Sequence, residues 1–148
     1  MPIQESAFAA LSLALTCVGQ CNVDIAEAII STLMERTDEQ LNDHFAKYFG
    51  VALGLIFMGQ QDKCEATLEA LGIIEHPIKK FYEIIIISSA YVGSGNVLKV
   101  QNMIHECLSD DKYTETAIIG LAQIASTEEV GNEMAMRLLN HILHFGKP

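Results

Sequence analysis

The feature that most constrains this chain is an internal repeat. Four segments share one pattern, in which an apolar helical stretch is followed by a turn and then by an amphipathic stretch. The turn falls at Gly19, Gly59, Gly93 and Thr127, at intervals of 40, 34 and 34 residues. Repeats of this length are typical of helical solenoids or rings, in which each hairpin buries its apolar face against its neighbours. The sequence therefore predicts an all-α fold made of helical-hairpin repeats.

The first repeat shows what each unit contributes. Residues 11–18 are apolar on nearly every side, which is typical of a buried helix. Gly19 suits the left-handed residue that ends a helix, and Asn22 suits the N-cap of the next one. Residues 23–35 are amphipathic: Val23, Ala26, Ile29, Ile30 and Leu33 share one side, whereas Asp24, Glu27, Ser31 and Glu35 share the other. We therefore expect buried inner helices to alternate with exposed outer helices.

The length of 148 residues suits one domain. We expect four hairpins at about residues 7–35, 44–75, 78–108 and 114–144, with polar links at 36–43 and 109–113. The His76-Pro77 pair should break the helical pattern between the second and third hairpins. The segment EIIIISSAY, residues 83–91, has strand propensity, but it occupies the inner-helix position of the repeat, so we predict a helix. Because the pattern stops at its last residues where a solenoid would continue, we interpret the chain as a fragment of a larger repeat protein.

Charge and hydropathy exclude several classes of function. The formal net charge of −10 argues against nucleic acid and anionic membranes as partners and favours basic ones. No apolar run approaches the roughly 20 residues of a membrane-spanning helix, and the first residues lack the basic region of a secretory signal. The four cysteines lie inside helical patterns, so we expect reduced thiols and a cytoplasmic or nuclear protein.

Two pairs of residues have the spacing of metal ligands. Cys17 and Cys21 are four residues apart, and His141 and His144 are three apart, so each pair would share a helix face as zinc ligands can. The two pairs fall in different hairpins, and Cys17 falls in an inner helix. We interpret both pairs as packing residues and predict neither a metal site nor a cofactor.

Candidate catalytic groups are also weak. Cys64 or Cys107 with a histidine could imitate a nucleophile pair, but both lack a strand-turn context and a third, orienting group. The sequence GSGN at residues 93–96 lacks the Lys-Ser/Thr that follows in a phosphate-binding loop. The repeat explains its glycines as a helix turn. We therefore predict that this chain has no catalytic residues and is not an enzyme.

Six segments carry a resemblance to a known family: LALTCVGQCN, TLMERT, ALGLIFMGQ, IEHP, AYVGSGNVLKVQ and EMAMRLLNHILHFG. Together they resemble the proteasome/cyclosome repeat family, and within it the central ring of the large non-ATPase ubiquitin-receptor subunit of the regulatory particle. The resemblance covers nearly the whole chain. It implies a toroid of alternating inner and outer helices. The long charged insertion that some relatives carry between the third and fourth hairpins is reduced here to residues 109–113.

The resemblance also implies a binding site for ubiquitin and for the ubiquitin-like domains of shuttle factors. In relatives, one outer helix presents acids at i, i+7 and i+11, which fall here on Asp24, Ser31 and Glu35. Ser31 departs from that pattern and removes one charge. These offsets keep residues on one helical stripe, and Ala28 and Glu27 share the exposed face. Carboxylates with small apolar neighbours suit the basic rim and apolar patch of ubiquitin.

The next outer helix has acids that could extend this surface, at Asp62, Glu65 and Glu69. The simpler interpretation is that acids on an amphipathic helix form a solvated face with no ligand. A rival function is a purely structural scaffold that contacts the proteasomal ATPase ring and other regulatory-particle subunits. Titration with labelled ubiquitin would distinguish a receptor from a scaffold.

Overall fold

The computed structural model describes residues 2–94, 96–108 and 114–124, together with positions 133, 136, 137 and 140. Within these ranges every regular element is a helix and no strand occurs, so the predicted all-α class is confirmed. The seven longer elements are α1 (Ile3–Thr16), α2 (Val23–Met34), α4 (Lys47–Ile56), α5 (Glu65–Leu71), α6 (Ile78–Ala90), α7 (Val97–Leu108) and α8 (Thr114–Ile124). The short elements are α3 (Asp38–Leu41), η1 (His44–Ala46) and η2 (Gln61–Cys64).

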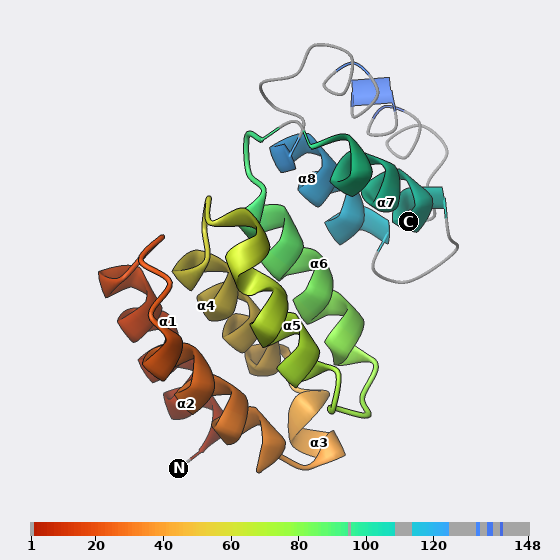
Figure 1. The fold of residues 1–148 in the computed structure, drawn as a ribbon. Helices are drawn as coiled ribbons and strands as arrows, with labels where there is room; N and C mark the ends of the chain where they lie inside the picture. The colour runs from red at the N-terminus through yellow and green to blue at the C-terminus, as the bar shows by residue number, and fades with distance from the viewer. Residues whose placement is uncertain are drawn as a thin grey trace.

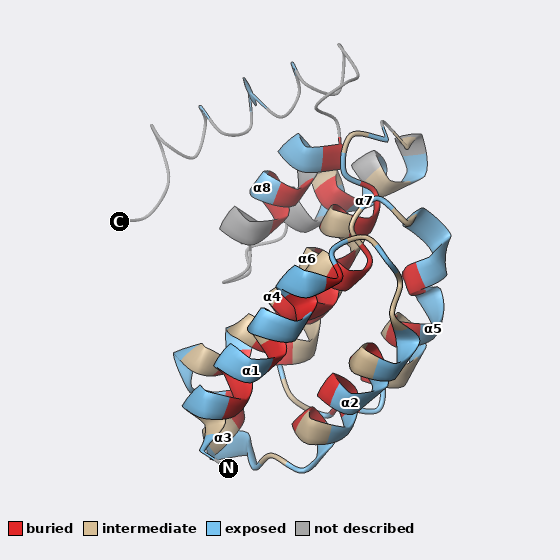
Figure 2. Ribbon diagram, turned by 90° about the vertical axis from the view of Figure 1, so that its left-hand side faces the viewer, coloured by how far each residue is buried: buried red, intermediate tan, exposed pale blue. Residues whose placement is uncertain are grey.

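The helices form two layers. Helices α1, α4, α6 and α8 pack in that order, each against the next, and make the inner layer (Figure 1). Helices α2 and α5 lie side by side in the outer layer (Figure 2). Helix α7 packs against α8. Buried residues lie on the sides where the inner helices meet, so the hydrophobic core runs along the inner helices and between the two layers. The outer helix expected in the fourth hairpin lies outside the described residues.

The turns repeat their geometry as well as their sequence. Gly19, Gly59 and Gly93 have φ of +71°, +74° and +68°, so the left-handed conformation predicted for Gly19 is confirmed and recurs at the next two turns. Each glycine N–H donates to a carbonyl near the end of the next inner helix, at Leu55, Ser89 and Gln123, with N···O distances of 2.9, 3.0 and 2.8 Å respectively. Each acceptor lies four residues before the turn position of its own repeat. The turns therefore join neighbouring repeats by equivalent hydrogen bonds.

Glycines let the inner helices approach closely. A Cβ atom at Gly54 of α4 would lie 2.8 Å from the Ser89 Oγ of α6, and one at Gly50 would overlap the Tyr82 ring. The Tyr82 hydroxyl donates to the Ala46 carbonyl at 2.6 Å, which satisfies a polar group in the core. These contacts fix how α4 packs against α6.

Helix α6 contains the segment of high strand propensity. Its residues are all buried or half-buried, because α4 covers one flank and α8 covers the other. The predicted helix is confirmed. Burial against two neighbours outweighs the small intrinsic preference of isoleucine for strands.

Burial of the first helix on nearly all sides was expected, and this expectation is wrong. Ala10 and Ala14 are buried, but Leu13 and Leu15 are 51% and 60% exposed. Among the described residues, α1 has an inner-layer neighbour, α4, on one flank only. Val23, expected on the apolar side of α2, is also 56% exposed, since it begins that helix.

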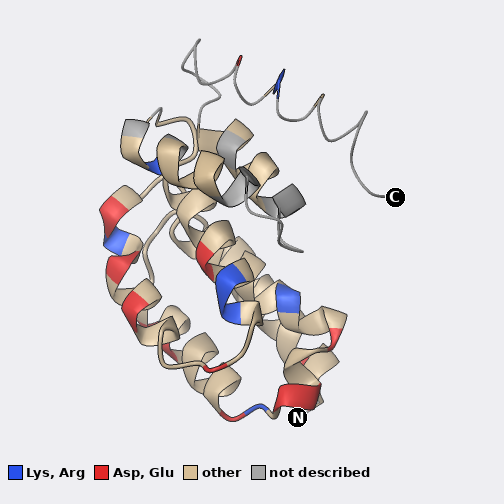
Figure 3. Ribbon diagram, turned by 90° about the vertical axis from the view of Figure 1, so that its right-hand side faces the viewer, with Lys and Arg blue, Asp and Glu red and all other residues tan. Residues whose placement is uncertain are grey.

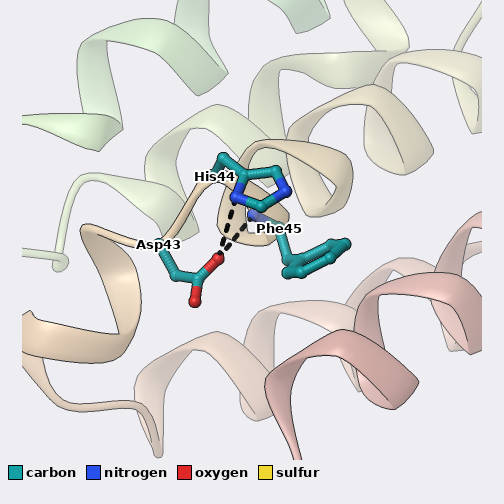
Figure 4. A network of polar contacts seen from close by, with 3 residues as sticks. All are labelled: Asp43, His44 and Phe45. Atoms are coloured by element: carbon teal, nitrogen blue, oxygen red, sulfur yellow. Dashed lines mark hydrogen bonds and ion pairs between the residues drawn. The ribbon is translucent and has the colours of Figure 1, made fainter.

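The polar link at residues 36–43 is more ordered than expected. It contains α3, whose N-terminus is capped by Thr37 and Gln40 in a capping box. Asp43 caps η1, because its Oδ1 accepts from the Phe45 N–H at 3.0 Å and lies 3.4 Å from His44 Nδ1 (Figure 4). His44 is largely exposed, so its contact with Asp43 adds little stability. No helix in the described part of the chain is both long and apolar enough to cross a bilayer.

Candidate functional site

Helix α2 presents the predicted acidic face to solvent. The side chain of Asn22 accepts from the Ile25 N–H at 3.2 Å, so it caps the helix as expected. The buried side faces the inner layer and consists of Ala26, Ile29, Ile30 and Leu33. The exposed side carries the predicted positions Asp24, Glu27, Ser31 and Glu35, together with Ala28. The capped start and the buried side together fix which residues face outward.

The stripe formed by Asp24, Ser31 and Glu35 is straight and long enough to meet a folded partner. At 3.6 residues and 5.4 Å per turn, the three positions fall within about 40° around the axis and span roughly 16 Å along it. Asp24 lies in the first turn, where a negative charge is favourable, whereas Glu35 is the C-cap, where it is unfavourable. The stripe thus places two carboxylates about three turns apart with a hydroxyl between them.

The second set of predicted acids lies in the same layer. Asp62, Glu65 and Glu69 are all exposed, and α5 packs beside α2. Asp62 is not part of α5, because it lies in the short helix η2 that precedes it. Figure 3 shows acidic positions recurring along the outer layer. The fold therefore brings the two predicted sets onto adjacent elements.

A groove of about 310 Å³ between α1 and α2 borders the stripe. Its walls are mainly apolar and include Leu13, Ile25 and Ile29, while Asp24 and Ala28 form part of its edge. This groove could not be predicted from the sequence, because its width depends on the spacing between two helices. An apolar groove edged by a carboxylate suits a ligand with both apolar and basic groups.

The other candidate groups of the sequence are its cysteines and histidines. Cys64 is fully buried, and burial raises the pKa of its thiol from 9.0 to about 11, so it is a poor nucleophile at neutral pH. Cys17 is buried, and its Sγ donates to the Leu13 carbonyl. Within the described residues, no three His, Cys, Asp or Glu side chains gather as metal ligands. His141, His144 and the Cys107 side chain lie outside the description.

No family model matches the chain. It is similar to segments of several curated proteins. It is 43% identical over 156 residues to the 26S proteasome regulatory subunit rpn1 of Schizosaccharomyces pombe, covering 99% of this chain and 18% of that protein. It is 37% identical over 150 residues to the 26S proteasome non-ATPase regulatory subunit 2 homolog A of Arabidopsis thaliana, covering 99% and 17%. For the Dictyostelium discoideum non-ATPase regulatory subunit 2 the identity is 35% over 138 residues, covering 92% and 15%. The chain spans less than a fifth of these relatives.

Proposed function

We propose that this chain, which is homologous to a segment of the non-ATPase regulatory subunits of the 26S proteasome, is a non-catalytic docking segment. It binds ubiquitin and the ubiquitin-like domains of shuttle proteins on the outer face of α2. The observation that carries this proposal is the exposed stripe of Asp24, Ser31 and Glu35 beside an apolar groove. Glu27 belongs to the same face, and Asp62, Glu65 and Glu69 extend it on the adjacent elements.

The composition of this surface suits a weak and reversible complex. Exposed ion pairs contribute only about 0.2–1 kcal/mol each, and the groove adds a modest apolar contact. We therefore expect a dissociation constant in the micromolar range or weaker, where 1 μM corresponds to about −8.2 kcal/mol. Affinity should fall as salt rises, because exposed charges are screened over about 8–10 Å at physiological ionic strength.

A titration of labelled ubiquitin against two charge-reversed variants tests the proposal. In Asp24→Lys/Glu35→Lys, ubiquitin binding should weaken at least tenfold, which corresponds to about 1.4 kcal/mol. Each change removes an attraction to the basic rim of ubiquitin and adds a repulsion from it. Both positions are exposed, so circular dichroism melts should show little change in folding. The matched control is Glu5→Lys/Glu39→Lys, which alters the net charge equally at two other exposed acids.

The proposal fails if the stripe variant binds as the unmodified chain does. It also fails if both double variants lose affinity equally, because the effect would then reflect net charge and not the stripe. A segment without any ubiquitin site would instead be a scaffold that contacts the proteasomal ATPases and other regulatory-particle subunits. The exposed apolar flank of α1 supports packing against such a neighbour. Either role places the protein in the cytoplasm and nucleus and requires no cofactor.

A further inference from the structure

We propose that a second groove, at the opposite end of α2 from its N-cap, binds a short linear peptide segment that has one or two large apolar side chains flanked by lysine or arginine. This groove lies between the C-terminal end of α2, helix α3 and the loop that joins α5 to α6. Figure 1 shows α3 and that loop at the same end of the molecule. The proposal does not depend on ubiquitin binding to the stripe.

The groove has an apolar floor and an apolar lip. Its volume is about 360 Å³, at the small end of the range for ligand sites, so it suits one or two side chains and not a folded domain. Leu33, Leu41 and Ile74 are buried beneath it. Met34 and Ile73, which also line it, remain 47% and 70% exposed. Two large apolar side chains that face solvent beside an apolar floor gain by being covered.

The charges around the groove select a cationic ligand. Asp38 and Glu75 line it, and neither forms an ion pair with any residue that the structure describes. Arg36 also lines the groove, and its Nη2 donates to Ser6 Oγ of α1 at 2.8 Å, so two carboxylates share the groove with one guanidinium. Added to the net charge of −10, this arrangement attracts lysine or arginine and repels an acidic segment.

The walls of the groove are held in place before any ligand arrives. The N–H of Ile78 donates to His76 Nδ1 at 3.1 Å, so the neutral ring carries its proton on Nε2. That Nε2–H donates to Asn42 Oδ1, also at 3.1 Å. His76 thereby joins the loop before α6 to the residue that ends α3. A preformed groove spares a ligand much of the entropic cost of ordering its site.

The test uses three synthetic hexapeptides and the full 148-residue chain. The first peptide has two central leucines flanked on each side by two lysines or arginines. The second replaces the leucines with serines, and the third replaces the cations with glutamates. Fluorescence anisotropy should show saturable binding of the first peptide only, because the groove needs both apolar contact and charge complementarity.

Two single substitutions then locate the site. Ile73→Ser should weaken the first peptide at least about fivefold, which corresponds to roughly 1 kcal/mol. Its matched control is Leu98→Ser on α7, since Leu98 has the same exposed fraction of 70%. Glu75→Gln should weaken binding and reduce its salt dependence, whereas Glu5→Gln should do neither. Both targets are exposed, so folding should persist.

Several outcomes would overturn the proposal. These are the absence of binding at millimolar peptide, equal binding of the acidic peptide, and equal loss in Ile73→Ser and Leu98→Ser. Light scattering adds one more arm. If the chain self-associates, and Ile73→Ser abolishes that association whereas Leu98→Ser does not, the groove binds a second copy and the peptide assignment is wrong. Loss of ubiquitin binding in the stripe variant without loss of peptide binding would separate the two surfaces.

Discussion

At the scale of single residues, Ser31 is the uncharged position of the predicted acidic stripe. It lies on the exposed face between Asp24 and Glu35 and takes no part in the buried side of α2. Its replacement by an acid would therefore change the stripe without disturbing the core. A substitution at position 31 can thus change the affinity for a ligand while the fold stays the same.

We predict that Ser31→Asp tightens ubiquitin binding by at most about fivefold, because one further exposed ion pair contributes about 0.2–1 kcal/mol. The measurement is the same titration used for the charge-reversed variants. Gln101→Glu, at an exposed position on α7, adds an equal negative charge and should leave affinity unchanged. Equal tightening in both variants would show that total charge is responsible.

A second residue-scale prediction concerns Cys64. Burial raises the pKa of its thiol to about 11 in the folded chain, above the ordinary value of 9.0. The unfolded chain therefore loses this proton at a lower pH than the folded chain does. The contribution to stability is complete below about pH 9 and is lost as pH rises toward about 11.

The free energy of unfolding, measured by urea titration, should accordingly fall between about pH 9 and pH 11. Cys64→Ala should be less stable at neutral pH and should show a smaller fall over this range. Iodoacetamide should modify half-buried Cys21 before buried Cys64 and Cys17. Modification of Cys64 as fast as Cys21 would contradict the burial on which both expectations rest.

At the scale of elements, the inner helices are held together by repeated turns and by close packing at small residues. The turn glycines donate equivalent hydrogen bonds to the next repeat. Helix α8 approaches α6 at Gly120, where an added Cβ would overlap Ser88 Oγ. Ser88 is buried, and its hydroxyl donates to the Ile84 carbonyl. The distance between α6 and α8 therefore depends on having no side chain at position 120.

We predict that Gly120→Ala destabilises the chain by about 1–3 kcal/mol through overpacking, although alanine is otherwise favoured over glycine in a helix by about 1 kcal/mol. Ser88→Gly removes the overlapping hydroxyl and its Cβ. The double variant Ser88→Gly/Gly120→Ala should then recover most of the loss that Gly120→Ala causes. Chemical denaturation of the four chains gives the coupling energy, and additive effects would refute direct contact.

At the scale of the whole molecule, one edge of the inner layer lacks a neighbour among the described residues. Leu15 is 60% exposed, and Phe8 is 45% exposed although its ring packs near Phe45 and Tyr48, whereas Leu13 lines the groove between α1 and α2. The corresponding flank of α4 is covered by α1, and the corresponding flank of α6 is covered by α4. The edge thus presents the surface that the other inner helices bury.

We predict that the isolated chain self-associates at high concentration through this edge, because large exposed apolar patches favour association. Leu15→Ser should shift the mass measured by light scattering toward the monomer, whereas Leu98→Ser should not. A strictly monomeric unmodified chain would contradict the prediction.

The features that could be predicted from the sequence are local ones. The helical repeat, the left-handed glycine turns and the outward side of α2 all follow from spacing along one chain, since a helix repeats every 3.6 residues and glycine tolerates positive φ without strain. The helix at residues 83–91 could also be predicted, because its position in the repeat outweighs its strand propensity. The acids of the candidate site were identified through the family resemblance, and only their exposure followed from the helical spacing and agrees with the structure.

The remaining features depend on distances between elements that are far apart in sequence, so they could not be predicted without the tertiary structure. The exposed side of α1 depends on which neighbours cover it, and the close approach at Gly120 depends on Ser88 in another repeat. Both grooves are spaces between helices, so their volumes and edges follow from how the helices pack. Asp62 lies in η2, before the start of α5, and Gln61, the first residue of η2, has a φ of +53°. Side-chain periodicity carries no information about these distances, since it specifies a face of one helix and not what lies against it.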